Sequence, residues 1–195
     1  MYKRQIENRV AALFAAAALG LAPLFVLPTT TAAASTDVKT ESASHCRRTL
    51  THYPVLRPGA RRPGVRTLQC AVNDLGLAPV VVDGWYGPQT KRALRAIVRS
   101  FEGTPAHPYR ITSTFWTTLY GAQLPDRTLR LGDHGHAVRV LQRALRAWGS
   151  ELIVDGDFGP QTQHTVEDLQ QALQIRPSGR VDRDTRYMLG GGFYW

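Results

Sequence analysis

The chain has 195 residues and a formal net charge of +9 at pH 7. This length suits two small domains, and a leader and a linker would leave no room for a catalytic domain beside them. The strongly basic composition favours polyanionic partners and carries no information about the fold.

Residues 1–34 have the pattern of an export signal. A basic start is followed by an apolar core at residues 11–26, and three alanines at 32–34 form a cleavage site before Ser35. The alternative is an uncleaved membrane anchor, but the apolar stretch is short for a membrane span. We therefore expect a cleaved signal peptide, a secreted or cell-wall location, and no stable membrane insertion after cleavage. The basic residues of the start are Lys3, Arg4 and Arg9.

Residues 35–54 are rich in Ser and Thr and show no apolar period, which predicts a flexible tether. Cys46 lies near the end of this segment, and the other cysteine, Cys70, lies in the first predicted helix after it. In an exported chain, two cysteines indicate a disulfide that would pin the tether to that helix. Two unpaired thiols, or Cys70 as a small core residue, are the alternatives.

An eight-residue sequence then occurs twice. DGWYGPQT spans residues 83–90 and DGDFGPQT spans residues 155–162, with six of the eight positions identical and Tyr86 exchanged for Phe158. An internal repeat of this kind decides the architecture. Apolar residues at helical spacing precede and follow both copies. Each unit is therefore predicted to contain a helix, a tight loop, a second helix and a short third helix.

The predicted fold is all-α, with two tandem three-helix units. Unit 1 covers residues 55–121, unit 2 covers residues 129–192, and residues 123–128 form a short hinge between them. In each loop, Asp-Gly predicts a turn and Gly-Pro predicts the N-cap and first residue of the next helix. Each unit is near the lower size limit for an independent core, so packing between the units, or the disulfide, is expected to be needed.

Unit 2 carries further motifs. A glycine-rich start and Val-x-x-Leu-Gln occupy residues 131–142, the octapeptide ends at Thr162, and Val-Asp-x-x-Thr follows at residues 181–185. These motifs resemble those of the bacterial peptidoglycan-binding repeat of the three-helix type. The resemblance implies noncovalent binding of cell-wall peptidoglycan without catalysis.

Unit 1 resembles the same repeat less closely. Outside the octapeptide, its matching residues are Gly64, Val65, Leu68 and Gln69. Thr112 and Phe115 stand where the family has an aspartate and a threonine at the third helix. With both copies, the resemblance extends over about residues 55–192.

Eight residues of the two loops are candidate ligand contacts. They are Asp83, Trp85, Tyr86, Thr90, Asp155, Asp157, Phe158 and Thr162. The aspartates that open the loops either accept hydrogen bonds from a ligand or form a turn near a helix N-terminus, where a carboxylate is favourable. The aromatic residues at the fourth position fit the core better than a ligand site, and the threonines could bond the backbone.

Trp85 has no aromatic counterpart in unit 2, where Asp157 takes its place. The fold therefore does not require an aromatic residue at this position. Trp85 would either stack on a sugar ring or pack against the other unit, and the sequence leaves both possibilities open.

No metal, cofactor or catalytic site is expected. The aspartates of loop 155–162 fail the calcium-loop pattern, because Gly159 and Val166 occupy ligand positions five and twelve. His134 and His136 have no second Cys/His pair that would complete a zinc site. There is also no nucleophile elbow and no glycine-rich phosphate loop.

The sequence thus predicts an exported, non-catalytic protein that binds peptidoglycan, with anionic wall polymers as possible further partners. The alternative is an extracellular adaptor or inhibitor on the same scaffold, which the divergence of unit 1 and the aromatic run at residues 193–195 favour. Arginine stripes suggest a nucleic-acid binder, but the export signal argues against that partner.

Overall fold

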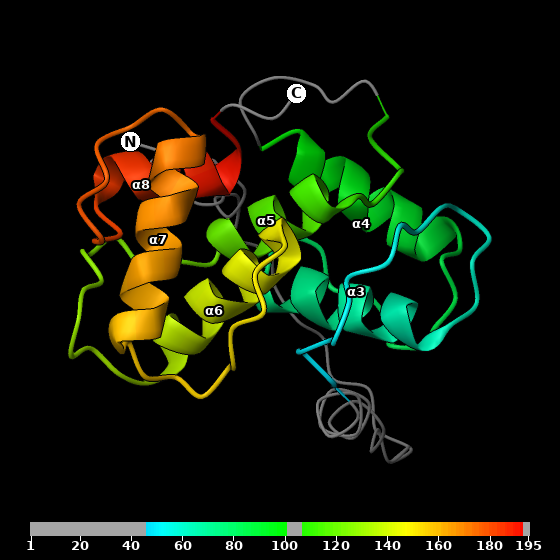
Figure 1. Ribbon diagram of the computed structural model, residues 1–195. Coiled ribbons are helices and arrows are strands. Elements are labelled where there is room, and N and C mark those ends of the chain that lie inside the picture. The colour runs from blue at the N-terminus through cyan, green and yellow to red at the C-terminus, as the bar shows by residue number, and fades with distance from the viewer. Residues whose placement is uncertain (1–45, 101–106, 193–195) are drawn as a thin grey trace, which may run out of the picture. The chain divides into compact units, whose positions relative to one another are not determined.

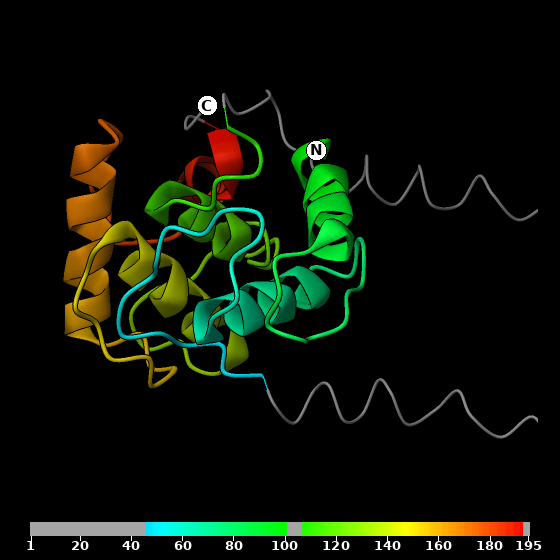
Figure 2. The same cartoon turned by 90° about the vertical axis from the view of Figure 1, so that its right-hand side faces the viewer.

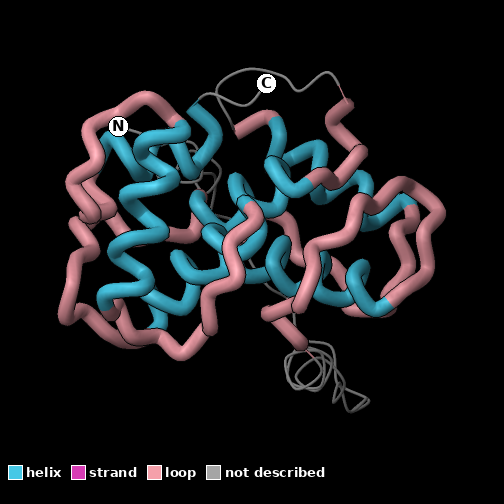
Figure 3. Tube along the Cα trace, in the orientation of Figure 1, coloured by secondary structure: helices cyan, strands magenta, loops and turns pink. Residues whose placement is uncertain are grey.

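The computed structural model describes residues 46–100 and 107–192 (Figure 1). The predicted signal peptide, residues 35–45 of the predicted tether and the aromatic run at 193–195 lie outside the described residues. The described residues all belong to one compact body. They contain helices and no strand, which confirms the all-α prediction (Figure 3). No helix in these ranges is long and apolar enough to cross a membrane.

The described residues form six α-helices and one π-helical turn. They are α3 (Pro63–Asp74), α4 (Pro88–Val98), α5 (Ser113–Gly121), α6 (His136–Trp148), α7 (Pro160–Ala172), α8 (Arg183–Tyr187) and the π-helical turn Met188–Gly192. Helices α4 and α7 start as predicted, with glycine at the N-cap and proline at the first helical position. At the third helices, Thr112 caps the Phe115 N–H and Asp182 caps the Thr185 N–H. The unusual Thr112 of unit 1 therefore performs the same capping role as Asp182 of unit 2.

The apolar stripes predicted from the sequence form the core. Val65 and Leu68 of α3 and Val138 and Leu141 of α6 are fully buried. Each unit is closed by a two-residue antiparallel bridge between its start and the residue before its third helix. Leu56 pairs with Ile111 in unit 1, and Leu129 pairs with Val181 in unit 2, through N–H to carbonyl bonds of 2.8 to 3.1 Å.

The two units pack on each other through α5. This helix lies against α6, and it also contacts the π-helical turn at the end of unit 2. In both views α5 and α6 lie between α4 and α7 (Figures 1 and 2). A side chain at Gly121 would overlap the backbone carbonyl of Leu189, so glycine is what allows α5 to approach the turn this closely.

The segment that connects the units is bound at several points. Leu124 is 7% exposed. Arg186 of α8 donates to the Asp126 carboxylate at 2.7 Å and to the Arg127 carbonyl at 2.9 Å. The short segment predicted as a hinge is therefore fastened to unit 2 by side-chain hydrogen bonds.

Residues 46–54, the described part of the predicted tether, are bound to both units. Tyr120 of α5 donates its hydroxyl to the Arg48 carbonyl at 2.8 Å, and Trp116 donates its indole N–H to the Pro54 carbonyl at 3.0 Å. From unit 2, Arg146 donates to the Thr51 carbonyl at 3.0 Å. This segment therefore adds to the packing that holds the units together.

Candidate functional site

The loop of unit 1 is built around the buried side chain of Gln69. Its amide nitrogen donates to Asp83 Oδ1 at 2.6 Å, the Trp85 carbonyl at 3.1 Å and Thr90 Oγ1 at 3.1 Å. Its amide oxygen accepts the Gly84 N–H at 2.9 Å. One side chain from α3 thus fixes the turn, the following residue and the first turn of α4.

The loop of unit 2 repeats this arrangement around Gln142 of α6. The amide nitrogen donates to Asp155 Oδ1 at 2.7 Å, the Asp157 carbonyl at 3.1 Å and Thr162 Oγ1 at 3.3 Å. The amide oxygen accepts the Gly156 N–H at 2.8 Å. We call these arrangements the glutamine cradles of the two loops.

A third glutamine cradle precedes α8 and was not found from the sequence. Gln170 donates to the Arg180 carbonyl and to Thr185 Oγ1, both at 2.8 Å, and it accepts the Gly179 N–H at 3.0 Å. In the corresponding place of unit 1, Phe115 fills the position of Thr185 and is 1% exposed. An apolar side chain there replaces the polar contact of unit 2.

Four of the eight candidate residues are buried beneath the loops. Tyr86 and Phe158 are each 1% exposed, and Thr90 and Thr162 are also buried. The Tyr86 hydroxyl donates to the Tyr109 carbonyl at 2.8 Å, and burial raises its pKa. These four residues hold the loops together in this structure, and a direct role for them in ligand binding stays a prediction.

The two aspartates that open the loops are exposed and ionised. For Asp155, the Asp157 N–H and the Gln142 side chain lower the carboxyl pKa below its ordinary value of 3.8. For Asp83, burial acts to raise the pKa, but hydrogen bonds from Gln69 and the Trp85 N–H outweigh it, so the pKa is lowered. In both loops Oδ1 accepts the bonds of the cradle.

An arginine of the preceding helix lies against each Asp-Gly turn. A Cβ on Gly84 would lie 3.1 Å from Arg66, and one on Gly156 would lie 2.9 Å from Arg139. Both glycines have positive φ values, 78° and 90°. The outer face of each loop therefore combines a carboxylate and a guanidinium, which suits a ligand carrying both donors and acceptors.

Comparison with known families gives a match within the second unit. Residues 134–189 match the family described as "Putative peptidoglycan binding domain". The match covers α6, α7 and α8 with the cradles of Gln142 and Gln170. It does not include unit 1. No curated protein and no solved structure matches the chain.

Unit 1 differs from the peptidoglycan-binding domain most clearly at Trp85. This side chain is 37% exposed, and the Arg61 guanidinium carbon lies 4.6 Å from the centroid of its ring. A Cβ on Gly87 would lie 2.7 Å from the Trp85 ring. The contacts of the ring with Arg61 and Gly87 thus come from its own unit. In the peptidoglycan-binding domain, Asp157 is exposed at this position.

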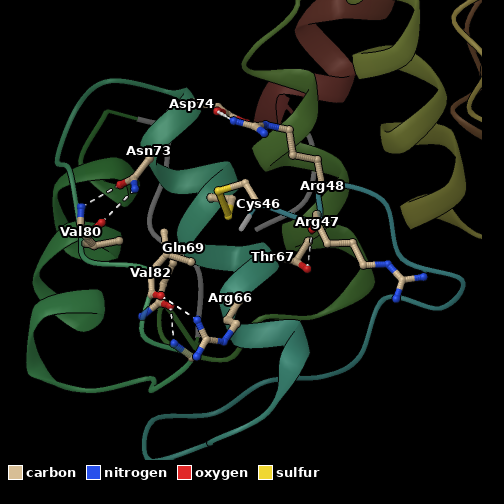
Figure 4. The surroundings of a disulfide bond; sticks show 12 residues. Cys46, Arg47, Arg48, Arg66, Thr67, Gln69, Asn73, Asp74, Val80 and Val82 are labelled. Carbon is tan, nitrogen blue, oxygen red and sulfur yellow. Dashed lines mark hydrogen bonds and ion pairs between the residues drawn. A yellow bond between two sulfur atoms is a disulfide. The ribbon is translucent and has the colours of Figure 1, made fainter. Parts of the chain in front are cut away.

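The predicted disulfide is confirmed. Cys46 and Cys70 are joined, with 5.7 Å between their Cα atoms (Figure 4). Beside it, the Arg48 guanidinium makes a bidentate contact with the Asp74 carboxylate, at 2.7 and 2.8 Å. The start of the described chain is therefore fixed to α3 covalently and by an ion pair.

Within the described ranges, no group of three or more His, Cys, Asp or Glu side chains could hold a metal ion. The loops can supply carboxylate acceptors, guanidinium donors and, in unit 1, an aromatic ring. This set is suited to hydrogen bonding and stacking with a sugar or peptide.

The glutamines at the centre of the cradles were missed as site residues. Gln69 and Gln142 entered the sequence analysis only as motif positions, although each directly follows a core leucine of its helix. An amide on the buried face of a helix requires hydrogen-bond partners. That requirement is the signal that could have linked each glutamine to the glycine turn after it.

Proposed function

We propose that this protein is an exported, non-catalytic binder of cell-wall peptidoglycan that uses both three-helix units. The observation that carries the proposal is the shared glutamine cradle. The peptidoglycan-binding domain at residues 134–189 has it at Gln142, and unit 1 has the same four contacts at Gln69. A disulfide together with a peptidoglycan-binding domain suggests a protein of the cell envelope.

In this proposal, the outer face of each loop contacts the ligand. Asp155 and Asp157 offer exposed carboxylates in unit 2, and Asp83 and Trp85 offer a carboxylate and a partly exposed indole ring in unit 1. The buried aromatic and threonine residues act indirectly, since they set the shape of the loop. Two linked weak sites gain avidity if the polymer presents both at a reachable spacing.

Sedimentation with insoluble peptidoglycan tests this function. The double variant Trp85→Ala, Asp157→Ala should lose most retention, because it removes one exposed contact from each loop without touching the glutamine cradles. We expect its helical circular dichroism to be unchanged, and Gln89→Ala, at an exposed position of unit 1, to be retained like the unaltered chain.

Two outcomes would contradict the proposal. One is retention no greater than that of an unrelated protein of equal positive charge. The other is capture of a single stoichiometric protein partner from the wall fraction with no peptidoglycan retention, which would favour an adaptor or inhibitor.

A further inference from the structure

A basic pocket contains none of the candidate ligand contacts of the two loops, although its lining reaches the residues just before loop 155–162. It has a volume of about 550 Å³ and is formed by residues 46–51, two arginines of α6 and residues 153–154. Four of its lining residues are arginines, and none of the lining residues is acidic. These arginines are Arg47, Arg48, Arg143 and Arg146. Like charges gathered in this way repel one another unless an anion lies between them.

Two of the four guanidinium groups are already committed. Arg48 makes its bidentate contact with Asp74, which Figure 4 shows beside the disulfide. Arg146 donates its two terminal nitrogens to the carbonyls of Leu152 and Thr51. These two arginines contribute positive charge to the pocket, but their hydrogen bonds already hold residues 46–51 and the chain after α6 in place.

The other two guanidinium groups, of Arg47 and Arg143, have N–H groups without an acceptor among the described residues. Arg143 is half-buried and uses only its Nε, which donates to Thr49 Oγ1 at 3.2 Å. Within the described chain, no carboxylate lies within ion-pair distance of it. The pKa of Arg143 is lowered, chiefly by burial. Arg47 is exposed, and its guanidinium, which extends away from the disulfide in Figure 4, has no partner among the described residues.

We propose that this pocket binds a phosphate group, held by the terminal nitrogens of Arg143 and by the guanidinium of Arg47. Guanidinium groups form paired hydrogen bonds with phosphate oxygens. The two arginines come from different segments, and phosphate presents acceptor oxygens in several directions, whereas a carboxylate presents two in one plane. This inference does not depend on peptidoglycan binding by either unit.

Part of the pocket lining is apolar. Ile153 is 68% exposed and lines the pocket next to the arginines. A pocket lined by guanidinium groups and aliphatic side chains can hold a phosphate together with the carbon chain attached to it. A phosphodiester polymer and a small phosphate ester share this chemistry.

Titration of the full chain with inorganic phosphate, at constant ionic strength set with chloride, tests the proposal. Backbone amides of residues 46–51 and 143–146 should shift and saturate. In Arg47→Gln the dissociation constant should rise roughly tenfold, the effect of one lost charge-assisted contact. Folding should be unaffected, since this side chain has no other partner in the described chain. Arg143→Gln should weaken binding at least as much.

Arg92→Gln is the matched control. Arg92 is exposed on α4, lies outside the pocket and has no side-chain partner among the described residues, so the same change in net charge should leave phosphate binding unchanged. An equal loss in Arg92→Gln and Arg47→Gln would overturn the proposal, because net charge alone would then explain binding. Shifts of the same size with acetate, or no saturable shift, would also overturn it.

Titration with two further ligands distinguishes a phosphodiester polymer from a small phosphate ester as the source of the phosphate group. If poly(glycerol phosphate) saturates the pocket at a lower concentration of phosphate groups than inorganic phosphate does, the ligand is a phosphodiester polymer. Tighter binding of glycerol phosphate than of the polymer would identify a small phosphate ester. Either result supports the pocket as a phosphate site.

Discussion

Gln69, Gln142 and Gln170 perform one task at three bends of the chain. Each accepts a glycine N–H through its amide oxygen and donates through its nitrogen to a backbone carbonyl. Glutamine suits this task because its amide is both an acceptor and a double donor. A carboxylate could not donate, and an apolar residue would leave the buried turn without partners.

The first prediction concerns Gln142→Leu. Leucine has a similar volume but would leave the buried Gly156 N–H and the Asp157 carbonyl without this partner. We expect the free energy of unfolding to fall by about 3 kcal/mol, since each buried group left unpaired costs about 1–3 kcal/mol. Urea unfolding followed by circular dichroism measures the change.

Gln161→Leu provides the control for that measurement. Gln161 is exposed at the start of α7, and its side chain makes no hydrogen bond within the described chain. Its replacement should change stability by less than about 0.5 kcal/mol. Equal effects of the two substitutions would show that the Gln142 contacts contribute nothing of their own.

At the residue scale, the sequence predicted the turns of the loops but not the glutamine cradles that hold them. Asp-Gly and Gly-Pro have local conformational preferences, so the turn and the start of α7 could be inferred from four neighbouring residues. The cradle joins Gln142 to residues more than ten positions away, and no local preference reports such a contact. The third cradle was hidden because Ser178 and Val181 replace the aspartate and aromatic residue of the octapeptide.

At the scale of the elements, the third helices show how unit 1 keeps the fold with different residues. Thr112 caps α5 with its hydroxyl, and buried Phe115 replaces a threonine that bonds Gln170 in unit 2. Both exchanges preserve the position of the helix. They also remove the polar motif at the third helix, which is why unit 1 resembles the family less closely.

The second prediction concerns residues 46–54 and the disulfide that anchors them. In the double variant Cys46→Ser, Cys70→Ala, the unfolded chain regains the freedom of a loop with a sequence separation of 24. The chain-entropy model gives a loss of about 3 kcal/mol in the free energy of unfolding. Thermal unfolding of the variant and the oxidised parent measures it.

Hydrogen exchange extends this test to the segment itself. Amides of residues 47–53 should exchange faster in the variant, while those of α7, which lies in unit 2, should change only with global stability. An unchanged melting temperature would show that the ion pair of Arg48 and the hydrogen bonds of the segment are sufficient without the disulfide.

At the scale of the whole molecule, α5 makes the two units interdependent. It belongs to unit 1 but packs on α6 and on the π-helical turn of unit 2. The Thr117 hydroxyl, whose shorter hydrogen bond is to the Ser113 carbonyl at 3.0 Å, also lies 3.4 Å from the Ala144 carbonyl of α6. Small domains gain stability when they share buried surface in this way.

The third prediction is therefore a single unfolding transition for both units. Gly121→Ala should lower the free energy of unfolding by about 2 kcal/mol, because the added methyl group overlaps the Leu189 carbonyl in a packed interface. Amide signals of α4 in unit 1 and of α7 in unit 2 should report the same midpoint.

Gly190→Ala is the matched control, since no atom lies within 4 Å of its added Cβ. It should leave the midpoint nearly unchanged. Two separate midpoints in the parent chain, or a Gly121→Ala effect confined to one unit, would show that the units unfold independently.

The small size of each unit led us to expect that packing between the units, or the disulfide, is needed, but the sequence did not predict which surfaces meet. The repeat defined two units and their helices, because periodicity records which face of each helix is buried. It contains no information on which buried faces meet. The composition of residues 35–54 predicted a flexible tether, yet the backbone carbonyls of its described part, residues 46–54, accept bonds from Tyr120, Trp116 and Arg146.

The disulfide also determines how a mechanical load would pass through the protein. A pull applied upstream of Cys46 crosses directly to Cys70, and the 23 residues between them carry no tension while the bond is intact. Reduction would release roughly 75 Å of additional contour length, from the extended length per residue less the 5.7 Å already spanned. The covalent link therefore shields residues 47–69 from tension applied at the start of the described chain.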